Sequence, residues 1–417
     1  MSAVTASAVT PGALQHVRVL DLSRVLAGPW AAQTLGDLGA EVIKVERPGV
    51  GDDTRQWGPP FLTDPQGQPT GESAYYLCAN RNKKSVVIDF TQAPGQVLVR
   101  ELAQKCDVVV ENFKSGGLAQ YGLDYAALSA LNPRLVYCSI TGFGQTGPYA
   151  HRAGYDFLIQ GMGGLMSITG KPDGEPGGGP VKVGVALTDI LTGLYASTAI
   201  LAALQAREHT GRGQHIDLAL LDVQVACLAN QGMNYLYSGN VPERMGNSHP
   251  NTVPYQDFPT SDGHMILAIG NDGQFGRFCV AAGKPEWASD ARFVTNAARL
   301  ANRAELIALM KRLTVQRSMR DWIALFEQHA VPCGPINTVA DVFADEQVQA
   351  RGMQIEMKHP QAGSIPLVAS PIRMSDTPVQ YRNSPPQLGQ HTQSVLRDQL
   401  GLSAEAIDEL YEQGVLG

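Results

Sequence analysis

One carboxylate in the sequence has a position suited to chemistry. Asp189 follows the small and apolar residues GVALT and opens a long apolar helical pattern, TGLYASTAILAAL. An aspartate at the start of an apolar helix is most often a helix cap. It can also act as a covalent nucleophile, and the positive end of a helix would keep it ionised, as a nucleophile requires. Local sequence leaves both roles open.

Other polar residues also have plain structural alternatives. Lys44 and Arg47 lie on and after EVIKVERPG. A basic pair at a strand end could hold the phosphates of a nucleotide, or could be solvated surface charge. Tyr155 and Asp156 in AGYDF could position a ligand, although a tyrosine at the start of a helix more often serves packing.

Common catalytic and metal-binding motifs are missing from the sequence. There is no Walker A motif, no G-x-S-x-G and no H-E-x-x-H, and GMGGLMSITG does not fit a dinucleotide-binding fingerprint. The six cysteines are far apart, with no CxxC pair, so buried thiols in a reducing compartment are expected and no metal site is.

The elements that would position these residues follow an alternating pattern. Short β-branched runs, each followed by a helical stretch or a loop, predict a doubly wound α/β sheet. Ligands bind beyond the carboxyl ends of such strands, so Glu46, Asn112 and Gly142 should face one cleft. The expected strands are HVRVLDLS, EVIKVE, KSVVIDF, DVVVENF, RLVYCSIT and, later in the chain, QHIDLALL.

The chain length of 417 residues predicts two domains, a large Rossmann-like α/β domain and a smaller α+β domain. A hairpin around Asp262 and Gly263 opens the smaller one. The expected segments are a flexible tail (1–14), the large domain (15–237), a linker (238–255), the small domain (256–335), a returning linker (336–382) and a C-terminal segment that packs on the large domain (383–417).

Composition excludes several classes of function. The content of 44% hydrophobic and 17% charged residues is typical of a soluble enzyme, and no apolar run long enough to span a bilayer is expected. The net charge of -7 carries no Lys/Arg block, which argues against a nucleic-acid partner. The N-terminal stretch lacks the features of a secretory signal, so a cytoplasmic location is expected, with the mitochondrial matrix as the alternative.

Segments along nearly the whole chain share the pattern of one family. They are VRVLDLSRVLAGPWAAQTLGDLGAEVIKVERPGVGDDTR, NRNKKSVVIDF, VVENFKSGGLAQYGL, GYDFLIQGMGGLMSITG, GVALTDILTGLYA, HTGRGQHIDLALLD, VPYQDFPTSDGHMILAIGND, VPCGPINTVADVFADEQV and PPQLGQHT. Together they closely resemble the class III CoA-transferases, which include formyl-CoA and carnitine CoA-transferases. The second half is most similar to succinate-hydroxymethylglutarate CoA-transferases, which suggests dicarboxylic acids as substrates.

The resemblance implies a role for each matching residue. The nucleophilic aspartate of the family falls on Asp189, and residues 15–237 become the CoA-binding domain. The family fold is an interlocked homodimer whose substrates are CoA thioesters and small carboxylic acids, with no tightly bound cofactor. The implied CoA contacts are Leu26, Ala27, Arg47, Ile88, Asp89, Phe90, Thr91, Asn112, Phe113, Lys114, Ala153, Gly154, Tyr155 and Asp156.

Departures from related proteins narrow the expected substrates. Formyl-CoA transferase has glutamine, arginine and glutamate where this chain has Leu26, Gln120 and Asp156, which argues against formate or oxalate. Related α-methylacyl-CoA racemases place a histidine where Tyr155 stands. A tyrosine, with an unperturbed pKa of about 10, is a poor proton acceptor at neutral pH, so a racemase or isomerase is the disfavoured first alternative.

The expected activity is transfer of CoA from an acyl-CoA, with succinyl-CoA preferred, through an anhydride and a thioester on Asp189. The glycine-rich segments GMGG (161–164) and GGGP (177–180) are candidate oxyanion donors or lids. A non-catalytic acyl-CoA-binding protein is the second alternative. The intact DILTG motif that begins at Asp189 argues against it.

Overall fold

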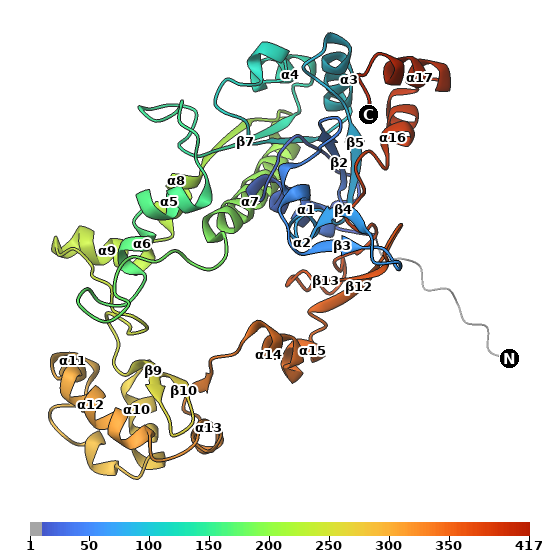
Figure 1. The fold of residues 1–417 in the computed structure, drawn as a ribbon. Coiled ribbons are helices and arrows are strands. Elements are labelled where there is room, and N and C mark those ends of the chain that lie inside the picture. Colours follow the sequence, from blue (N-terminus) through green and yellow to red (C-terminus); the bar gives the residue numbers. More distant parts are fainter. Residues whose placement is uncertain (1–10) are drawn as a thin grey trace. The chain divides into compact units, whose positions relative to one another are not determined.

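The computed structural model describes residues 11–417, which divide into two compact units (Figure 1). The larger unit takes the described residues up to Gly164, together with Val183–Gly232 and Gln347–Gly417. The smaller unit takes Leu165–Lys182 and Met233–Glu346. Of the tail expected at 1–14, residues 1–10 lie outside the described residues. Leu14 donates its N–H to Leu38 O at 2.9 Å and packs against the core of the larger unit.

A six-stranded parallel sheet forms the centre of the larger unit. Its strand order is β5-β2-β1-β6-β7-β8, so the direction of winding reverses between β1 and β6. The carboxyl ends of all six strands lie at one edge, and the crevice at the reversal is where such sheets bind ligands. The doubly wound α/β prediction is therefore confirmed. The strands are β1 (Arg18–Asp21), β2 (Glu41–Glu46), β5 (Lys83–Val87), β6 (Val108–Glu111), β7 (Val136–Thr141) and β8 (His215–Ala219).

Helices cover both faces of this sheet because its strands are apolar on both sides. In β1, Val19 faces one core cluster and Leu20 faces the other, as alternating side chains of a strand must. The Val19 face is covered by α1 (Ala27–Asp37) and α7 (Leu187–Thr210). The opposite face is covered by α3 (Ala93–Gln104), α4 (Tyr125–Leu131), α16 (Thr392–Leu400) and α17 (Ala404–Glu412).

The C-terminal residues complete the larger unit. Val395 and Leu396 of α16 and Ile407 of α17 share the core cluster of α3 and the sheet. Hydrogen bonds join this segment to the strands, since His391 donates its N–H to Ser85 O at 2.9 Å and Val87 donates to the Thr392 hydroxyl at 3.0 Å. Two hairpins were not foreseen from the sequence: β3 (Phe61–Thr63) with β4 (Pro69–Ser73), and β12 (Gln354–His359) with β13 (Gly363–Val368).

The smaller unit has its own core around an antiparallel sheet. The strands β9 (Tyr255–Pro259), β10 (His264–Ala268) and β11 (Cys333–Pro335) form this sheet, and the β9–β10 turn contains the expected hairpin residues Asp262 and Gly263. The principal helices are α10 (Asp272–Ala281), α12 (Arg303–Thr314) and α13 (Met319–Gln328). Strands beside helices confirm the α+β class.

The boundaries of the smaller unit differ from the expected 256–335. Residues 233–255 and 336–346 belong to it rather than to linkers, and so does the distant stretch Leu165–Lys182. Arg244 accounts for the last inclusion, because its guanidinium donates to Ser167 O at 3.1 Å and pairs with Asp173. Contacts that span 77 and 71 residues leave no signal in local composition.

The expectation of six buried thiols is only partly met. Cys106, Cys138 and Cys279 are buried, whereas Cys78 is exposed and the other two are intermediate. Cys78 lies directly after α2 (Ala74–Leu77), where its thiol donates to Tyr75 O at 3.0 Å. No disulfide forms among residues 11–417, which include all six cysteines.

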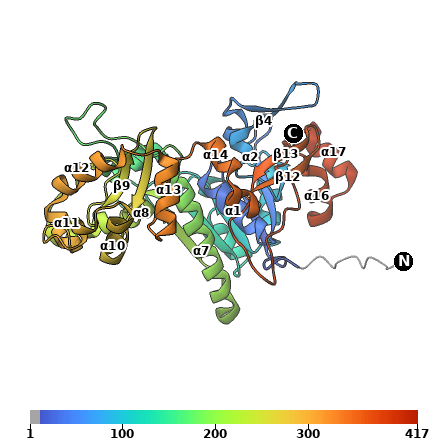
Figure 2. The same ribbon diagram turned by 90° about the horizontal axis from the view of Figure 1, so that it is seen from below.

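Helix α7 is long, with 24 residues (Figure 2), and most of them between Asp189 and Gln205 are apolar or small. Contrary to the sequence expectation, it has the length and composition that a membrane-spanning helix needs. Half of its most apolar window is nevertheless buried inside the protein, where it lies beside α1 and the sheet. A core helix of this kind is weak evidence for a membrane role, since many buried helices have the same composition.

A glycine allows α7 to approach α1 closely. A Cβ atom at Gly193 would lie 2.8 Å from the carbonyl oxygen of Ala27 and 3.0 Å from Cβ of Trp30. Real Cβ atoms are hardly ever found closer than 3.0 Å to another heavy atom, so the helices must move apart to admit any side chain. Because α1 begins at the carboxyl end of β1, this contact also fixes the start of α1 relative to α7.

We expect Gly193→Val to lower the free energy of unfolding of the larger unit by about 1–3 kcal/mol, the usual cost of overpacking a core. Urea unfolding followed by circular dichroism measures the change. Gly276→Val in α10 is the matched control, because no heavy atom of a non-neighbouring residue lies within 4 Å of a Cβ at that helical glycine. Equal unfolding midpoints for the two variants would contradict the packing argument.

Candidate functional site

A cleft of about 520 Å³ opens at the carboxyl ends of the strands of the larger unit. Its walls come from the segments that follow β1, β2, β5, β6 and β7, and from the first turn of α7. The cleft thus lies where the strand order reverses between β1 and β6, as expected for this type of sheet. Glu46, Asn112 and Gly142 all line it, so the prediction that they face one cleft is confirmed.

The turn after β1 is held in a strained form. Val25 has φ = 72°, a left-handed conformation that is rare for a β-branched residue. The Asn112 side chain bonds to both backbone groups of Arg24, the residue before Val25. It accepts from Arg24 N at 2.9 Å and donates to Arg24 O at 2.6 Å. Asp52 accepts from Val25 N at 3.2 Å. These contacts from the residue after β6 and from the turn after β2 place Leu26 and Ala27 at the wall of the cleft.

A buried ion pair supports the same turn. Lys44 Nζ lies 2.9 Å from Asp52 Oδ2 and donates to Ser23 O at 2.8 Å, and both charged side chains are at most 1% exposed. Burial by itself opposes ionisation, but the neighbouring Lys44 lowers the pKa of Asp52 to about 2. Lys44 is therefore a structural cation. Arg47, the other member of the basic pair considered for phosphate binding, is about half exposed, and its guanidinium lies 2.6 Å from the Asp53 carboxylate.

Asp189 occupies the third residue of α7 and lines the cleft. The helix begins after Ala186, which has no side-chain cap. Instead, Asp156 of α5 (Asp156–Met162) accepts hydrogen bonds from Thr188 N at 2.8 Å and from Asp189 N at 3.3 Å. The capping role considered for Asp189 thus belongs to Asp156. Among residues 11–417, no group hydrogen-bonds to the carboxylate oxygens of Asp189, so they are free to meet a ligand.

Two glutamines hold this arrangement in place. Gln160 donates to Asp156 Oδ2 at 2.7 Å and accepts from Val183 N at 2.9 Å. Gln224 accepts from the Thr188 hydroxyl at 2.7 Å and is 1% exposed. The first turn of α7 is therefore connected to α5 and to α8 (Leu220–Ala226) by a continuous set of hydrogen bonds.

The environment of Asp189 raises its pKa to about 7, mainly by burial and further by the charge of Asp156. The sequence had led us to expect an ionised carboxylate stabilised by the helix N-terminus. Burial opposes this ionisation, and Asp156 accepts from the N–H groups of the first turn and adds a like charge, so the helix N-terminus does not lower the pKa of Asp189 below its usual range.

Tyr75 is a titratable residue influenced by the charge of Asp189, and the sequence gave no reason to select it. Burial raises the pKa of its hydroxyl to about 12, and the charge of Asp189 contributes next. A charge effect of this kind requires the two groups to be close. The ring of Tyr75 meets Trp57 edge-on, with centroids 5.3 Å apart. The Tyr75 hydroxyl thus stays protonated at neutral pH.

Most of the residues expected to contact CoA meet in this cleft. Ile88 does not line it, because its side chain is fully buried in the core beneath α3. Asp89 does not line it either and accepts from Thr91 and Gln92 at the start of α3. Asp156, also an expected CoA contact, accepts hydrogen bonds from the first turn of α7. The residues that do line the cleft are Leu26, Ala27, Arg47, Phe90, Thr91, Asn112, Phe113, Lys114, Ala153, Gly154, Tyr155 and Asp189.

The N–H groups of Gly163 and Gly164 in the segment GMGG already have hydrogen-bond acceptors. Gly163 N donates to Ile159 O at 2.7 Å, and Gly164 N lies 3.5 Å from Gly161 O, so GMGG uses these groups within its own turn. The segment GGGP belongs to the smaller unit, where Gly178 forms a bridge to Lys171. The expectation that GMGG supplies oxyanion donors is therefore not met by the N–H groups of Gly163 and Gly164.

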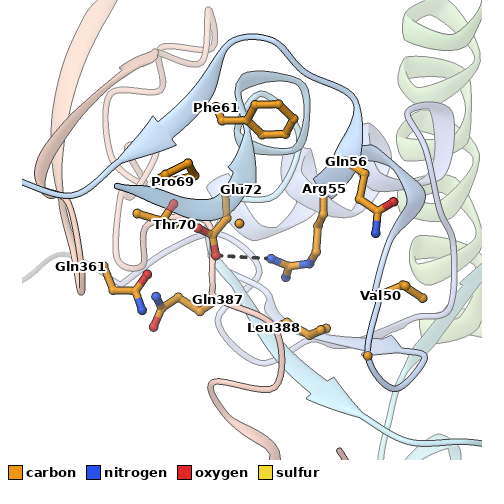
Figure 3. Close-up of a pocket in the computed structure, with 12 residues that line it drawn as sticks. Val50, Arg55, Gln56, Phe61, Pro69, Thr70, Glu72, Gln361, Gln387 and Leu388 are labelled. Atoms are coloured by element: carbon orange, nitrogen blue, oxygen red, sulfur yellow. Dashed lines mark ion pairs between the residues drawn. The ribbon is translucent and has the colours of Figure 1, made fainter. Parts of the chain in front are cut away.

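A second cavity in the larger unit, of about 670 Å³, has a different character (Figure 3). Figure 3 shows the Arg55 guanidinium facing Glu72, with Gln361 and Gln387 on another side. The Arg55 guanidinium donates two hydrogen bonds, of 2.9 and 2.8 Å, to the Glu46 carboxylate. Neither Asp189 nor any of the expected CoA contacts lines this cavity. The cleft with Asp189 is therefore the candidate active site.

Comparison with known proteins identifies the family. The sequence model of CoA-transferase family III matches residues 14–392. A succinate–glutarate CoA-transferase of Agrobacterium fabrum is 54% identical over 385 residues, covering 92% of this chain and 95% of that protein. A succinyl-CoA:glutarate CoA-transferase of Mus musculus is 46% identical over 403 residues, covering 97% and 90%. The crystal structure of a CAIB/BAIF family protein from Brucella suis matches with a TM-score of 0.81 and 53% identity, covering 93% of this chain and 100% of that one.

The chain therefore belongs to CoA-transferase family III, and the family resemblance seen in the sequence is confirmed. The protein is a CoA-transferase. The fold of the larger unit and the position of its cleft agree with an enzyme that must hold a long nucleotide-bearing thioester at a strand edge.

We expect the Asp189 carboxyl group to titrate near pH 7 and to titrate at lower pH in Asp156→Asn, because that change removes the neighbouring negative charge. Carbon-13 NMR of aspartate-labelled protein measures the titration, and the missing signal in Asp189→Asn assigns it. Asp222→Asn, an exposed acid on α8, is the control and should leave the midpoint unchanged. A midpoint near pH 4 in the wild type would refute the burial argument.

Proposed function

We propose that the protein transfers CoA from succinyl-CoA to a short dicarboxylic acid, with Asp189 as the covalent nucleophile. The observation that carries this proposal is the buried, unbonded carboxylate of Asp189 in the strand-edge cleft of a CoA-transferase. The expected CoA contacts that line the same cleft are proposed to bind the thioester substrate. The chemistry needs no resident cofactor.

The choice of substrates rests on relatives. The two similar proteins described above are named for transfer between succinate and glutarate, and their likeness covers at least nine tenths of this chain. Succinyl-CoA is therefore the proposed donor, and glutarate or another short dicarboxylate is the proposed acceptor. Formate and oxalate are not proposed, since Leu26, Gln120 and Asp156 all differ from formyl-CoA transferase.

The proposed reaction exchanges bonds of similar energy. Attack of the Asp189 carboxylate on the succinyl-CoA carbonyl breaks the C–S bond and forms a mixed anhydride and CoA thiolate. The thiolate attacks the Asp189 carbonyl, giving an enzyme thioester and releasing succinate. The acceptor carboxylate displaces the thiolate to form a second anhydride. Attack of the thiolate on the acceptor carbonyl then forms the new acyl-CoA and restores Asp189.

The electrostatics of Asp189 suit this role. A carboxylate removed from water, with no hydrogen-bond donor on its oxygens, is a stronger nucleophile than a solvated one.

The raised pKa of Asp189 makes the reaction depend on pH, since only the ionised carboxylate can attack. The value of kcat/KM for the donor should therefore rise as pH increases through about 7.

We expect Asp189→Asn to reduce kcat more than about 1000-fold, as loss of a covalent nucleophile commonly does. The variant should keep its fold and bind CoA. Mass spectrometry of wild type incubated with succinyl-CoA and quenched with hydroxylamine or borohydride tests the intermediate directly. The modification should map to Asp189 within residues 185–194 and be absent from the variant.

Two results would redirect the assignment. Near-normal turnover in Asp189→Asn would exclude the covalent mechanism. Exchange of deuterium into the α-carbon of an acyl-CoA without an acceptor acid would instead indicate an isomerase, the activity that Tyr155 disfavours. A panel of dicarboxylates and monocarboxylates, compared by kcat/KM, then decides the acceptor class.

We also propose that the protein is the interlocked homodimer implied by its family resemblance. In α9 (Ala229–Ser238) no residue is buried, and Leu236 and Tyr237 are 75% and 93% exposed. Large exposed apolar side chains commonly mark association surfaces. Light scattering coupled to size exclusion should give twice the mass of one chain, whereas a single-chain mass at micromolar concentration would contradict the proposal.

A further inference from the structure

The second cavity of the larger unit has no role in the proposed transfer reaction (Figure 3). Its volume of about 670 Å³ exceeds the 520 Å³ of the cleft that holds Asp189. Four segments of the larger unit form its walls: the stretch after β2, the hairpin of β3 and β4, the turn between β12 and β13, and the stretch before α16. The fold therefore builds a second concave site away from the active site.

Glu72 is a buried carboxylate on the wall of this cavity. The residue is 2% exposed, and its Oε2 atom has no hydrogen-bond partner among residues 11–417. Its Oε1 atom lies 3.6 Å from Arg55 Nη1, which is an ion pair but longer than a hydrogen bond. A buried acceptor without a donor costs free energy, so a ligand that brings a donor to Glu72 would be stabilised there.

Arg55 cannot turn to supply the missing donor. Its guanidinium donates to Glu46 through two hydrogen bonds, to the Tyr76 hydroxyl at 2.6 Å and to Pro386 O at 3.0 Å. It also lies over the Tyr76 ring, 3.8 Å from the centroid. Rotation toward Glu72 would break these buried contacts. The Oε2 atom of Glu72 thus stays open to a ligand.

The buried charges beside the cavity do not balance. Glu46 and Glu72 are two carboxylates, and Arg55 is the cation that pairs with both of them. Lys44 also acts on Glu46, but its own ion pair is with Asp52. One negative charge therefore remains without a matching cation.

His359 does not supply the missing positive charge. Burial lowers the pKa of its ring, although the charge of Glu72 acts in the opposite direction. Its Nδ1 atom accepts from Gln361 N at 3.4 Å and from Ala362 N at 3.2 Å, as the neutral ring can. The imidazole is thus neutral at pH 7, and the cavity favours a positively charged ligand.

The remaining walls offer apolar surface and neutral amides. Phe61 and Val50 are 41% and 38% exposed, and Leu388 lies on the same cavity. Figure 3 shows Gln361 and Gln387 on another side from Arg55. Within the described part of the chain, neither of these two side-chain amides forms a hydrogen bond. Methylene groups could pack on the apolar wall, and a polar group could bond to the amides.

We propose that the second cavity binds a small aliphatic ammonium compound whose charged group donates hydrogen bonds to Glu72. An ammonium group carries three N–H donors and one positive charge. It therefore meets the unpartnered Oε2 atom and balances the extra carboxylate at the same time. An anion would instead be repelled by Glu72 and Glu46. Binding at this site does not depend on transfer at Asp189.

The test uses two probes of the same length and the full chain. They are 5-aminopentan-1-ol and its uncharged counterpart pentane-1,5-diol. Saturation-transfer difference NMR measures the dissociation constant of each. We expect the amino alcohol to bind at least about 10-fold more tightly than the diol, because it alone makes charged hydrogen bonds. Carboxylates are unsuitable probes, since they would also bind the active site as acceptor acids.

Variants locate the bound ammonium group. Glu72→Gln removes the charge with little change of shape and should weaken binding of the amino alcohol about 10-fold or more. Glu101→Gln, an exposed acid on α3 outside the cavity, is the matched control and should bind it as the wild type does. Asp189→Asn removes the buried carboxylate of the active site and should also leave binding unchanged.

A gain of binding is tested separately. Gln361→Glu places a second carboxylate on an exposed part of the cavity wall. It should tighten binding of the amino alcohol about twofold to fivefold, as an exposed ion pair does. Retained CoA binding by Glu72→Gln shows that its larger unit is folded. If that variant does not fold, Gln361→Glu decides, and an unchanged affinity there overturns the proposal.

Four other results would also overturn it. Equal binding of the two probes would show that charge is not recognised, and undiminished binding in Glu72→Gln would remove the anchoring carboxylate. Loss of binding in Asp189→Asn would place the amine in the active-site cleft. Absence of binding to the wild-type protein would show that the cavity does not accept a free amine.

Discussion

The site depends on one hydrogen-bonded contact, the closure of the first turn of α7 by Asp156. A helix start leaves N–H groups that need acceptors, and here a carboxylate from another helix supplies them. Because Asp156 caps the helix, Asp189 does not cap it although it lies in the same turn. The same contact brings a second negative charge near Asp189 and contributes to its high pKa. Reactivity and helix stability are thus coupled through a single side chain.

The wall of the cleft formed by the turn after β1 depends on hydrogen bonds from Asn112 and Asp52 to its backbone. The left-handed backbone at Val25 costs energy for a β-branched residue, so it persists only where its surroundings fix it. Asn112, directly after β6, bonds to the backbone of the preceding Arg24, and Asp52, in the turn after β2, accepts from Val25 N. The strand reversal between β1 and β6 therefore creates the crevice, and these side chains shape its edge.

Much of the fold could be predicted from the sequence because the relevant signals are local. Apolar β-branched runs marked the parallel strands, and Asp262 with Gly263 marked the hairpin of the smaller unit. The family pattern pointed to Asp189. Long-range contacts left no local signal. The attachment of Leu165–Lys182 through Arg244, the capping by Asp156 and the cavity lined by Glu72 and Gln387 all join residues that only the folded chain brings together.

The larger unit is built from segments that come before and after the main part of the smaller unit in the sequence. This affects the order in which the larger unit can fold. Val415 and Leu416 lie in the same core cluster as Leu20 of the first strand. During synthesis, the part of this sheet face that α3 and α4 do not cover therefore stays exposed until residues 395–416 have left the ribosome. Contacts at such sequence separation slow folding and prolong the exposure of apolar surface. A folding helper that shields that face would thus act mainly before the C-terminal helices arrive.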